Sequence, residues 1–187
     1  MRVLTGKLKG RPLKMSKPDL RPTQDKTRKA IFDILGEAVA GAQFLELFAG
    51  SGAVGIEALS CGAGMVWFVE NDREAIAALR DNLSGLGISN YEVIPKDAFS
   101  VIEQMAGQKR KFDIIFLDPP YYQDLAKKSL LSLASCDILS PSGLVIIQHF
   151  KKDIIPDKTD SLELFKQKKY GDTLVSFYQM RPKLTER

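Results

Sequence analysis

The sequence predicts one α/β domain whose mostly parallel sheet is covered by helices on both faces and ends in an antiparallel hairpin. Between residues 44 and 150, short apolar runs alternate with segments in which apolar residues recur every three or four positions. This alternation is typical of repeated strand–helix–strand units around a parallel sheet. Two further strand-like segments, residues 162–170 and 173–180, flank Gly171-Asp172, which favours a hairpin turn.

The first predicted helix spans about residues 24–40, since Ile31, Leu35 and neighbouring apolar residues form one stripe at helical spacing. Thr23 is its expected N-cap and Gly41 its expected end. Short apolar runs bounded by turn residues then predict five strands, at residues 44–48, 65–70, 91–95, 112–117 and 144–150. The intervening segments are predicted as helices at residues 54–60, 73–83, 98–105 and 126–134. With the terminal hairpin, the sheet is expected to have seven strands.

The 187 residues are 44% hydrophobic and 27% charged, which suits one globular domain with a sizeable core. No apolar run is long enough to span a bilayer, and the basic N-terminus has no apolar stretch of the signal-peptide type. Cys61 and Cys136 are far apart and in no metal or redox spacing. We therefore expect a cytoplasmic protein with reduced thiols, no bound metal and no membrane partner.

Positive charge is concentrated at the N-terminus. Residues 1–30 contain ten Lys and Arg against two Asp, a balance of +8, so with a net charge of +4 the remainder carries −4. This block predicts a basic β-hairpin, residues 1–22, that binds nucleic acid and leaves the ligand pocket of the body, residues 23–187, unaffected. A solvated tail is the alternative. The candidate contact residues of this arm are Arg2, Lys7, Lys9, Arg11, Lys14 and Arg21.

A glycine-rich loop follows the first strand of the parallel sheet. Gly50-x-Gly52-x-x-Gly55 matches the dinucleotide fingerprint, and Glu70 lies at a suitable distance to hold a ribose, so a nicotinamide-dependent oxidoreductase is one candidate. Glu46, in the strand before the glycines, favours S-adenosylmethionine instead, because a carboxylate suits an ammonium group and a cationic sulfur but not a pyrophosphate. An oxidoreductase also needs a proton donor near the hydride, and the only histidine, His149, lies in an apolar run typical of a structural residue.

Acidic residues also follow the second and third strands. Glu70 can accept hydrogen bonds from ribose hydroxyls, and Asp97 from an adenine amino group, although either acid alone can equally be a helix cap. Their recurrence at one edge of the sheet favours a ligand site. The candidate cofactor-binding residues are Glu46, Phe48, Ala49, Gly50, Ser51, Gly52, Glu70, Asn71, Asp97, Ala98 and Asp118.

The fourth strand of the parallel sheet ends at Asp118-Pro119-Pro120-Tyr121, the candidate catalytic residues. The two prolines lack backbone donors and have fixed φ angles, so the chain must leave the sheet there. Asp118 and the Pro119 carbonyl can accept hydrogen bonds from one amino group, and Tyr121 can stack on a flat ring. This arrangement suits the exocyclic amino group of a nucleobase, whereas the simplest alternative is a strand end with an ordinary turn.

Four segments occur in this order: RPTQDKTRKAIFDIL, LELFAGSGAVGIEALSCGA, FVENDREAIAALRDNL and FDIIFLDPPYY. Together they resemble the bacterial 16S ribosomal RNA guanine-N2 methyltransferase family (the RsmD family), whose known member modifies guanine 966. The resemblance covers nearly the whole chain. It implies a class I S-adenosylmethionine-dependent methyltransferase fold, which is Rossmann-like. It also implies S-adenosylmethionine as cofactor, and as partner 16S RNA in the 30S subunit or an assembly intermediate.

The same resemblance assigns Glu46, Gly50 and Gly52 to the first cofactor loop, Glu70 to the ribose, Asp97 to the adenine, and residues 118–121 to the catalytic loop. It makes the basic arm an RNA-binding element, gives His149 no role, and leaves a monomer as the simplest expectation. The Asp-Pro-Pro-Tyr motif also occurs in enzymes that methylate adenine N6, so such an enzyme remains an alternative. A non-catalytic RNA-binding assembly factor is a further alternative, which the complete motif disfavours.

Overall fold

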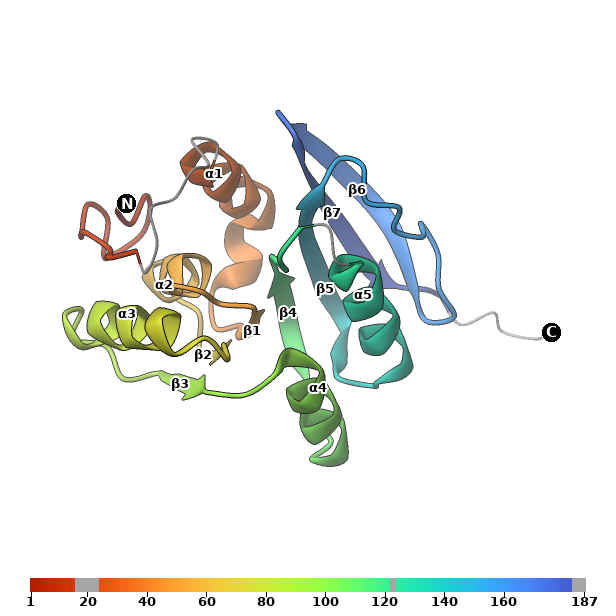
Figure 1. Ribbon diagram of the computed structural model, residues 1–187, viewed down its shortest axis with the longest axis horizontal. Helices are drawn as coiled ribbons and strands as arrows, with labels where there is room; N and C mark the ends of the chain where they lie inside the picture. Colours follow the sequence, from red (N-terminus) through yellow and green to blue (C-terminus); the bar gives the residue numbers. More distant parts are fainter. Residues whose placement is uncertain (16–23, 122–123, 183–187) are drawn as a thin grey trace.

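The computed structural model describes residues 1–15, 24–121 and 124–182, and across these residues seven strands form one sheet (Figure 1). The strands are β1 Gln43–Leu47, β2 Met65–Val69, β3 Tyr91–Ile94, β4 Phe112–Leu117, β5 Leu139–Phe150, β6 Leu162–Tyr170 and β7 Thr173–Met180. The helices are α1 Gln24–Leu35, the short 3-10 helix η1 Gly36–Val39, α2 Ala53–Ser60, α3 Arg73–Ser84, α4 Ala98–Gly107 and α5 Leu125–Ser135. None of the described helices is long and apolar enough to cross a membrane.

The strand order is β3-β2-β1-β4-β5-β7-β6. The first five strands in this order are parallel, and β7 pairs antiparallel with both β5 and β6. The chain runs outward from β1 to β3 and then returns to place β4 on the other side of β1. In open α/β sheets, ligands bind at the carboxyl ends of the strands where the order reverses in this way. The topology therefore directs attention to the ends of β1 and β4.

Two apolar cores lie on opposite faces of the sheet. Side chains alternate between them along each strand, so Phe44 of β1 packs toward α1, α2 and α3, whereas Leu45 packs toward α4 and α5. Figure 1 shows the same division, with α1 to α3 grouped on one side of the sheet and α4 and α5 on the other. Burial on both faces explains why the central strands read as nearly continuous apolar runs.

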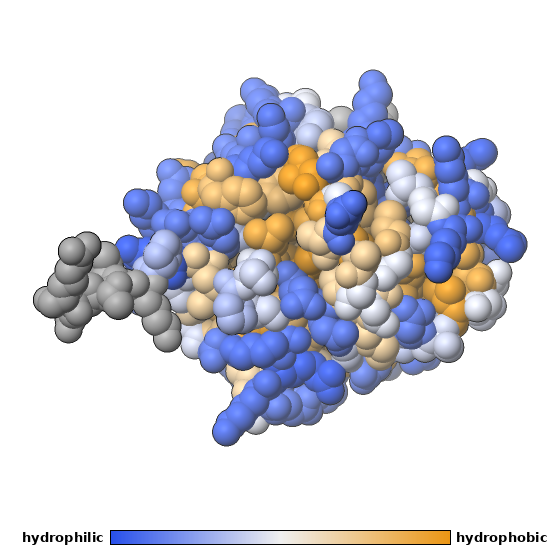
Figure 2. Space-filling model, turned by 180° about the vertical axis from the view of Figure 1, so that it is seen from behind, coloured by the Kyte–Doolittle hydropathy of each residue, from blue (hydrophilic) through white to orange (hydrophobic). Residues whose placement is uncertain are grey.

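Hydrophilic side chains dominate the rim of the face seen from behind, and hydrophobic ones gather toward its middle (Figure 2). Among the described large apolar side chains, Leu131, Ile154 and Phe165 are exposed. They come from α5, from the segment between β5 and β6, and from β6.

The basic N-terminal segment forms a compact loop rather than two regular strands. One antiparallel bridge joins Arg2 to Pro12, and Val3 and Leu13 are buried in the core beside α1 and α2. A Cβ on Gly6 would lie 2.0 Å from the Ser60 carbonyl oxygen, which shows how closely this loop approaches the end of α2. The expected hairpin is thus present in reduced form over residues 1–15. The rest of the predicted arm, with Arg21, and the expected N-cap Thr23 lie outside the described residues.

Two element boundaries differ from the sequence expectations by more than two residues. The first helix ends at Leu35 instead of continuing to residue 40, because Gly36 has a φ of 51° and a 3-10 turn follows. Strand β5 begins at Leu139 instead of residue 144, although Pro141 and Gly143 resemble a turn. The pairing of β5 with β4 is irregular there, which allows these residues to join the strand edge.

Candidate active site

Four neighbouring strands are in register near the carboxyl edge of the sheet. Leu47 of β1 pairs with Val69 of β2 and with Leu117 of β4, and Leu117 in turn pairs with Ile147 of β5. The residues that come next along these strands therefore lie side by side. They are Glu70, Phe48, Asp118 and Gln148.

The end of β2 and helix α3 both hold the backbone of the glycine loop. Ala49 N–H donates to the Val69 carbonyl at 2.9 Å, and Gly50 N–H donates to Glu70 Oε2 at 2.7 Å. The Ser51 carbonyl accepts a hydrogen bond from Asn82 Nδ2 of α3 at 3.0 Å. The loop is therefore fixed in place by β2, Glu70 and α3 through its backbone.

The three glycines of the motif serve different purposes. Gly52 has a φ of 77°, and a Cβ there would lie 2.2 Å from Leu79 Cδ1. A Cβ on Gly55 would lie 2.4 Å from the Phe68 ring and 2.6 Å from Glu46 Oε2, so α2 can pack this closely only without a side chain. Gly50 also has a positive φ, but no atom lies within 4 Å of the position that a Cβ would take there, which leaves space for a ligand.

Phe48 adopts a strained backbone conformation at the start of the loop. Its φ of 58° lies in the left-handed region, which is unusual for a bulky residue and costs about 1–2 kcal/mol. Its ring packs edge-on against Phe99 of α4, with 6.4 Å between the ring centroids. Strain of this kind is concentrated at functional sites, and here it turns the chain out of β1 toward the predicted cofactor.

Glu46 is buried beneath the glycine loop, with 3% of its surface exposed. Its Oε2 accepts a hydrogen bond from Gly55 N–H at 2.9 Å, so the side chain also caps the first turn of α2. Burial raises the pKa of Glu46 to about 8, together with the nearby charges of Asp118 and Glu70 and against the lowering effect of the α2 backbone amides. A buried acid with a raised pKa is well suited to a ligand that carries positive charge.

The raised pKa predicts how stability depends on pH. Glu46 has an ordinary pKa of 4.5 in the unfolded chain and about 8 in the folded protein, so ionisation favours unfolding. We expect the ligand-free protein to lose about 2–4 kcal/mol of stability relative to Glu46→Gln as the pH rises from 5 to 8. Urea unfolding of wild type and Glu46→Gln across this pH range measures the difference in their free energies of unfolding. The contributions of the other titrating groups cancel in this difference. A constant difference would show that Glu46 is ionised throughout.

Glu70 and Asp97 already have backbone partners. Glu70 Oε1 accepts hydrogen bonds from the Asn71 and Asp72 amides, while its Oε2 holds Gly50. Asp97 caps α4 by accepting from Phe99 and Ser100. Asp97 thus has the helix-cap role that was the alternative to ligand binding, whereas Glu70 holds the glycine loop, and each carboxylate retains lone pairs for a ligand.

Two further predicted cofactor contacts at these strand ends, Ala98 and Asn71, differ in the exposure of their side chains. The side chain of Ala98 is buried in the core beneath α4, so only its backbone could face a ligand. Asn71 is exposed.

The catalytic candidates are fixed by β5 and β7. Asp118 Oδ2 accepts a hydrogen bond from Gln148 Nε2 at 3.0 Å. The Tyr121 hydroxyl lies 3.0 Å from the Thr173 hydroxyl, and its ring lies against Phe150 with 5.6 Å between centroids and a tilt of 35°. Both candidate side chains therefore have a defined orientation before any substrate is present.

Gln148 was not predicted as a site residue. It is 7% exposed and lies on the same sheet face as Ile146, directed toward the end of β4. A polar residue inside an apolar strand was the available signal, since buried amides require partners. The neighbouring His149 is buried, with Nε2 2.8 Å from the Ser176 hydroxyl, and its structural role stays a prediction. Burial lowers the pKa of His149 below its ordinary value.

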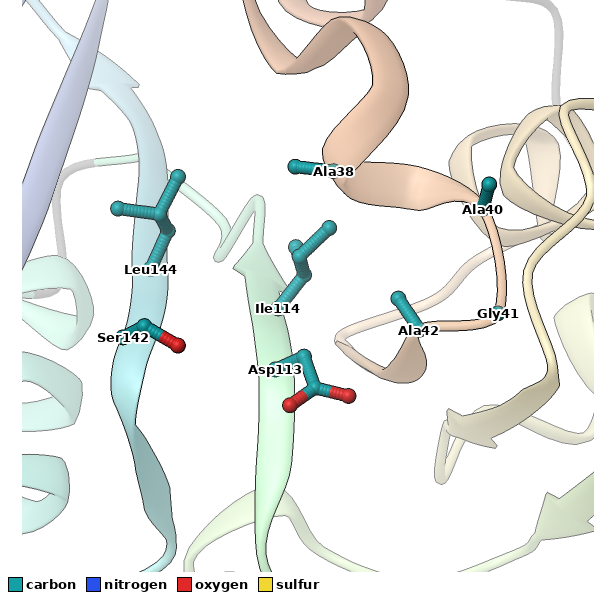
Figure 3. A pocket seen from close by; sticks show the side chains of 8 residues that line it. All are labelled: Ala38, Ala40, Gly41, Ala42, Asp113, Ile114, Ser142 and Leu144. Atoms are coloured by element: carbon teal, nitrogen blue, oxygen red, sulfur yellow. The ribbon is translucent and has the colours of Figure 1, made fainter.

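A hollow of about 320 Å³ lies at the opposite edge of the sheet (Figure 3). It lies between Ala38 and Ala42 on one side and Ser142 and Leu144 on the other. Its one carboxylate, Asp113, already accepts a hydrogen bond from the Gln43 amide at 2.9 Å. This hollow has neither the acidic groups nor the glycine loop of the carboxyl edge, so it is not the candidate active site.

Comparison with known proteins decides the family. The family model described as Conserved hypothetical protein 95 matches residues 1–179. "Putative rRNA methyltransferase YlbH" of Bacillus subtilis (strain 168) is 36% identical over 183 residues, which are 97% of this chain and 100% of the relative. "Ribosomal RNA small subunit methyltransferase D" of Escherichia coli (strain K12) is 31% identical over 180 residues, which are 96% of this chain and 89% of the relative. The chain belongs to the ribosomal RNA small subunit methyltransferase D family.

Solved structures of this family and beyond share the fold. The structure titled "Putative methyltransferase yhhF from Escherichia coli" is 31% identical, has a TM-score of 0.84 and covers 96% of this chain and 97% of that chain. SMU.776, described as a putative methyltransferase complexed with SAH, has a TM-score of 0.70 over 85% of this chain and 50% of that chain. At 18% identity, it supports the fold alone. The predicted family and the class I methyltransferase fold are confirmed.

Proposed function

We propose that this protein transfers a methyl group from S-adenosylmethionine to the exocyclic N2 of a guanine in 16S ribosomal RNA, at the position equivalent to guanine 966. The observation that carries the proposal is the pairing of Asp118 with Gln148 at the end of β4, beside the glycine loop of β1. A carboxylate held in this orientation next to a cofactor loop suits an amino group as methyl acceptor. The names of the relatives support ribosomal RNA as the substrate.

The cofactor site fits the donor in charge and shape. Gly50 leaves open space at the loop, buried Glu46 suits the cationic methionine end, and Glu70 and Asp97 offer acceptors toward the ribose and adenine. S-adenosylmethionine supplies a methyl group activated by its sulfonium. The methyl carbon would bond to the acceptor nitrogen as its bond to sulfur breaks, S-adenosylhomocysteine would leave, and the methylated nitrogen would lose one proton to give the neutral product.

The catalytic loop prepares the acceptor nitrogen. The lone pair of a guanine amino group is delocalised into the ring, so this nitrogen is a poor nucleophile. Asp118 and the Pro119 carbonyl accept hydrogen bonds from its two N–H groups, which orients the nitrogen and stabilises the positive charge that develops on it. Tyr121 stacks on the base, which is worth about 1–3 kcal/mol. The base must leave its stack in the RNA to reach this loop.

The finer parts of the proposal follow from the family and the charge distribution. The substrate is the 30S subunit or an assembly intermediate, which places the protein in the cytoplasm. Among the described large apolar side chains only Leu131, Ile154 and Phe165 are exposed, and so small a number supports a monomer. The basic N-terminal segment contacts the RNA backbone through exposed Arg2, Lys7, Lys9 and Arg11.

RNA binding by this segment should depend on salt. In the double variant Lys7→Gln, Lys9→Gln, two fewer cations can release counterions, so the slope of log affinity against log salt should become shallower by about 1.4–1.8. Lys127→Gln, Lys128→Gln is a matched control, because both lysines are exposed on α5 and the charge change is the same. Filter binding of 16S RNA between 50 and 300 mM salt, roughly the range where such slopes are linear, measures the effect. An equal change in both variants would place the RNA surface elsewhere.

Labelled methyl transfer tests the proposed activity. Purified protein is incubated with undermethylated 30S particles and labelled S-adenosylmethionine, and the RNA is digested to nucleosides. Label in N2-methylguanosine is the expected result. Label in N6-methyladenosine would instead support the alternative in which the Asp-Pro-Pro-Tyr loop acts on adenine, and absence of label would favour a non-catalytic assembly factor.

A further inference from the structure

Asn82 of α3, a buried side chain, links the N-terminal segment to the glycine loop. Asn82 is 6% exposed. Its Oδ1 accepts from Lys14 N–H at 2.7 Å, and its Nδ2 donates to the Lys14 carbonyl at 3.0 Å. The amide thus pairs with both backbone groups of one residue, as a neighbouring strand would.

The same amide nitrogen also contacts the cofactor loop. Asn82 Nδ2 donates its second hydrogen to the Ser51 carbonyl at 3.0 Å. Ser51 is 8% exposed, and its hydroxyl lies 3.5 Å from the sulfur of Met15. Lys14 and Met15 are therefore held against the loop that the proposed function assigns to S-adenosylmethionine.

We propose that Asn82 is a positioning residue that makes the N-terminal segment part of the cofactor site. This inference rests on the proposed function, since it concerns the same glycine loop. It differs from the expectation that the basic arm leaves the ligand pocket unaffected. The Ser51 carbonyl is fixed by an amide whose orientation is set by Lys14, so a change in the segment reaches the loop through Asn82.

The chemistry of an amide explains why neither aspartate nor alanine serves equally well here. One acceptor and two donors are used, and they face one N–H and two carbonyls. Aspartate retains the acceptor but brings a carboxylate against two carbonyl oxygens. Alanine leaves all three backbone groups without this partner.

The test measures binding and hydrogen exchange in the full chain, for wild type, Asn82→Ala, Asn82→Asp and Asn90→Ala. Asn90 is the matched control, because its Nδ2 also donates to two carbonyls, those of Ala63 and Gly64, at the opposite end of the sheet. S-adenosylmethionine affinity is measured by calorimetry below the melting temperature of each variant. Exchange is followed by mass spectrometry in the peptide covering residues 10–15, with and without S-adenosylmethionine.

We expect both Asn82 variants to bind S-adenosylmethionine about tenfold more weakly, the loss that follows from about one hydrogen bond. S-adenosylmethionine should slow exchange in residues 10–15 of wild type and Asn90→Ala, and this slowing should disappear in the Asn82 variants. A general loss of stability would not selectively remove the effect of S-adenosylmethionine on exchange in residues 10–15.

Slowing that persists in the folded Asn82 variants, or affinity within twofold of wild type, would overturn the inference and leave the proposed function intact. Should Asn82→Ala fail to fold, Asn82→Asp provides the same comparison with wild type. If wild type itself does not bind S-adenosylmethionine, the proposed function fails, and this inference fails with it.

Discussion

Asp118→Ala should lower the rate of methyl transfer by about 10²–10³-fold, the loss expected when one group that stabilises developing charge is removed. The carboxylate is oriented by Gln148 at 3.0 Å, so it is ready to meet the acceptor nitrogen without rearrangement. Its contacts matter most as that nitrogen becomes cationic. Binding of S-adenosylmethionine and of RNA should therefore change little, and the loss should appear in kcat rather than in KM.

Asp113→Ala is the matched control for this variant. Asp113 lies on the same strand, β4, but at its other end, where it accepts a hydrogen bond from the Gln43 amide at 2.9 Å. Single-turnover transfer from labelled S-adenosylmethionine to undermethylated 30S particles measures both variants under the same conditions. A normal rate for Asp118→Ala, or an equal loss in Asp113→Ala, would show that the end of β4 is not the catalytic position.

Glu57→Ala should have the largest effect on stability, a loss of about 3–5 kcal/mol, which is typical of breaking a buried ion pair from one side. Glu57 is 1% exposed and accepts from Arg28 Nε at 3.1 Å. The same carboxylate accepts from the Leu4 and Thr5 amides. Its removal leaves Arg28, 3% exposed, without its buried counter-charge, and it releases the N-terminal segment from α2.

An exposed ion pair on α1 provides the comparison. Lys29 Nζ lies 2.7 Å from Asp33 Oδ2, and more than half of each side chain is exposed. Asp33→Ala should therefore lower the free energy of unfolding by less than about 1 kcal/mol. Urea unfolding monitored by circular dichroism measures both variants. Glu57→Met combined with Arg28→Met should restore only part of the loss, because apolar side chains can replace a buried pair but leave the Leu4 and Thr5 amides without this acceptor. Equal effects for Glu57→Ala and Asp33→Ala would contradict a buried clamp.

The fold was largely predictable because its signals are local. Apolar runs, helical spacing and turn residues lie within short stretches of sequence, and they are sufficient to give the order of strands and helices. The boundary errors have local causes too. Gly36 ends α1 early through its positive φ, and residues 139–143 join β5 across an irregular pairing despite Pro141. In each case the sequence contained the residue but not the conformation it would adopt.

The candidate site could be predicted only from residues that form a motif along the chain. The glycines, Glu46 and Asp118-Pro119-Pro120-Tyr121 have a pattern along the chain. Gln148 and Asn82 have none, because their roles depend on partners 30 and 68 residues away. Charge counting fails for the same physical reason. Arg28 contributed to the basic block of residues 1–30, yet it is buried against Glu57 and cannot meet RNA.

Mass spectrometry of 16S ribosomal RNA from a strain that lacks this gene tests the central claim most directly. The prediction is that one guanine lacks its N2-methyl group, and that wild-type protein restores it whereas Asp118→Ala, produced at the same level, does not. A complete modification pattern in the deletion strain would contradict the proposed activity. A missing methyl group on adenine would contradict guanine N2 as the target, and restoration by Asp118→Ala would contradict the role of this carboxylate.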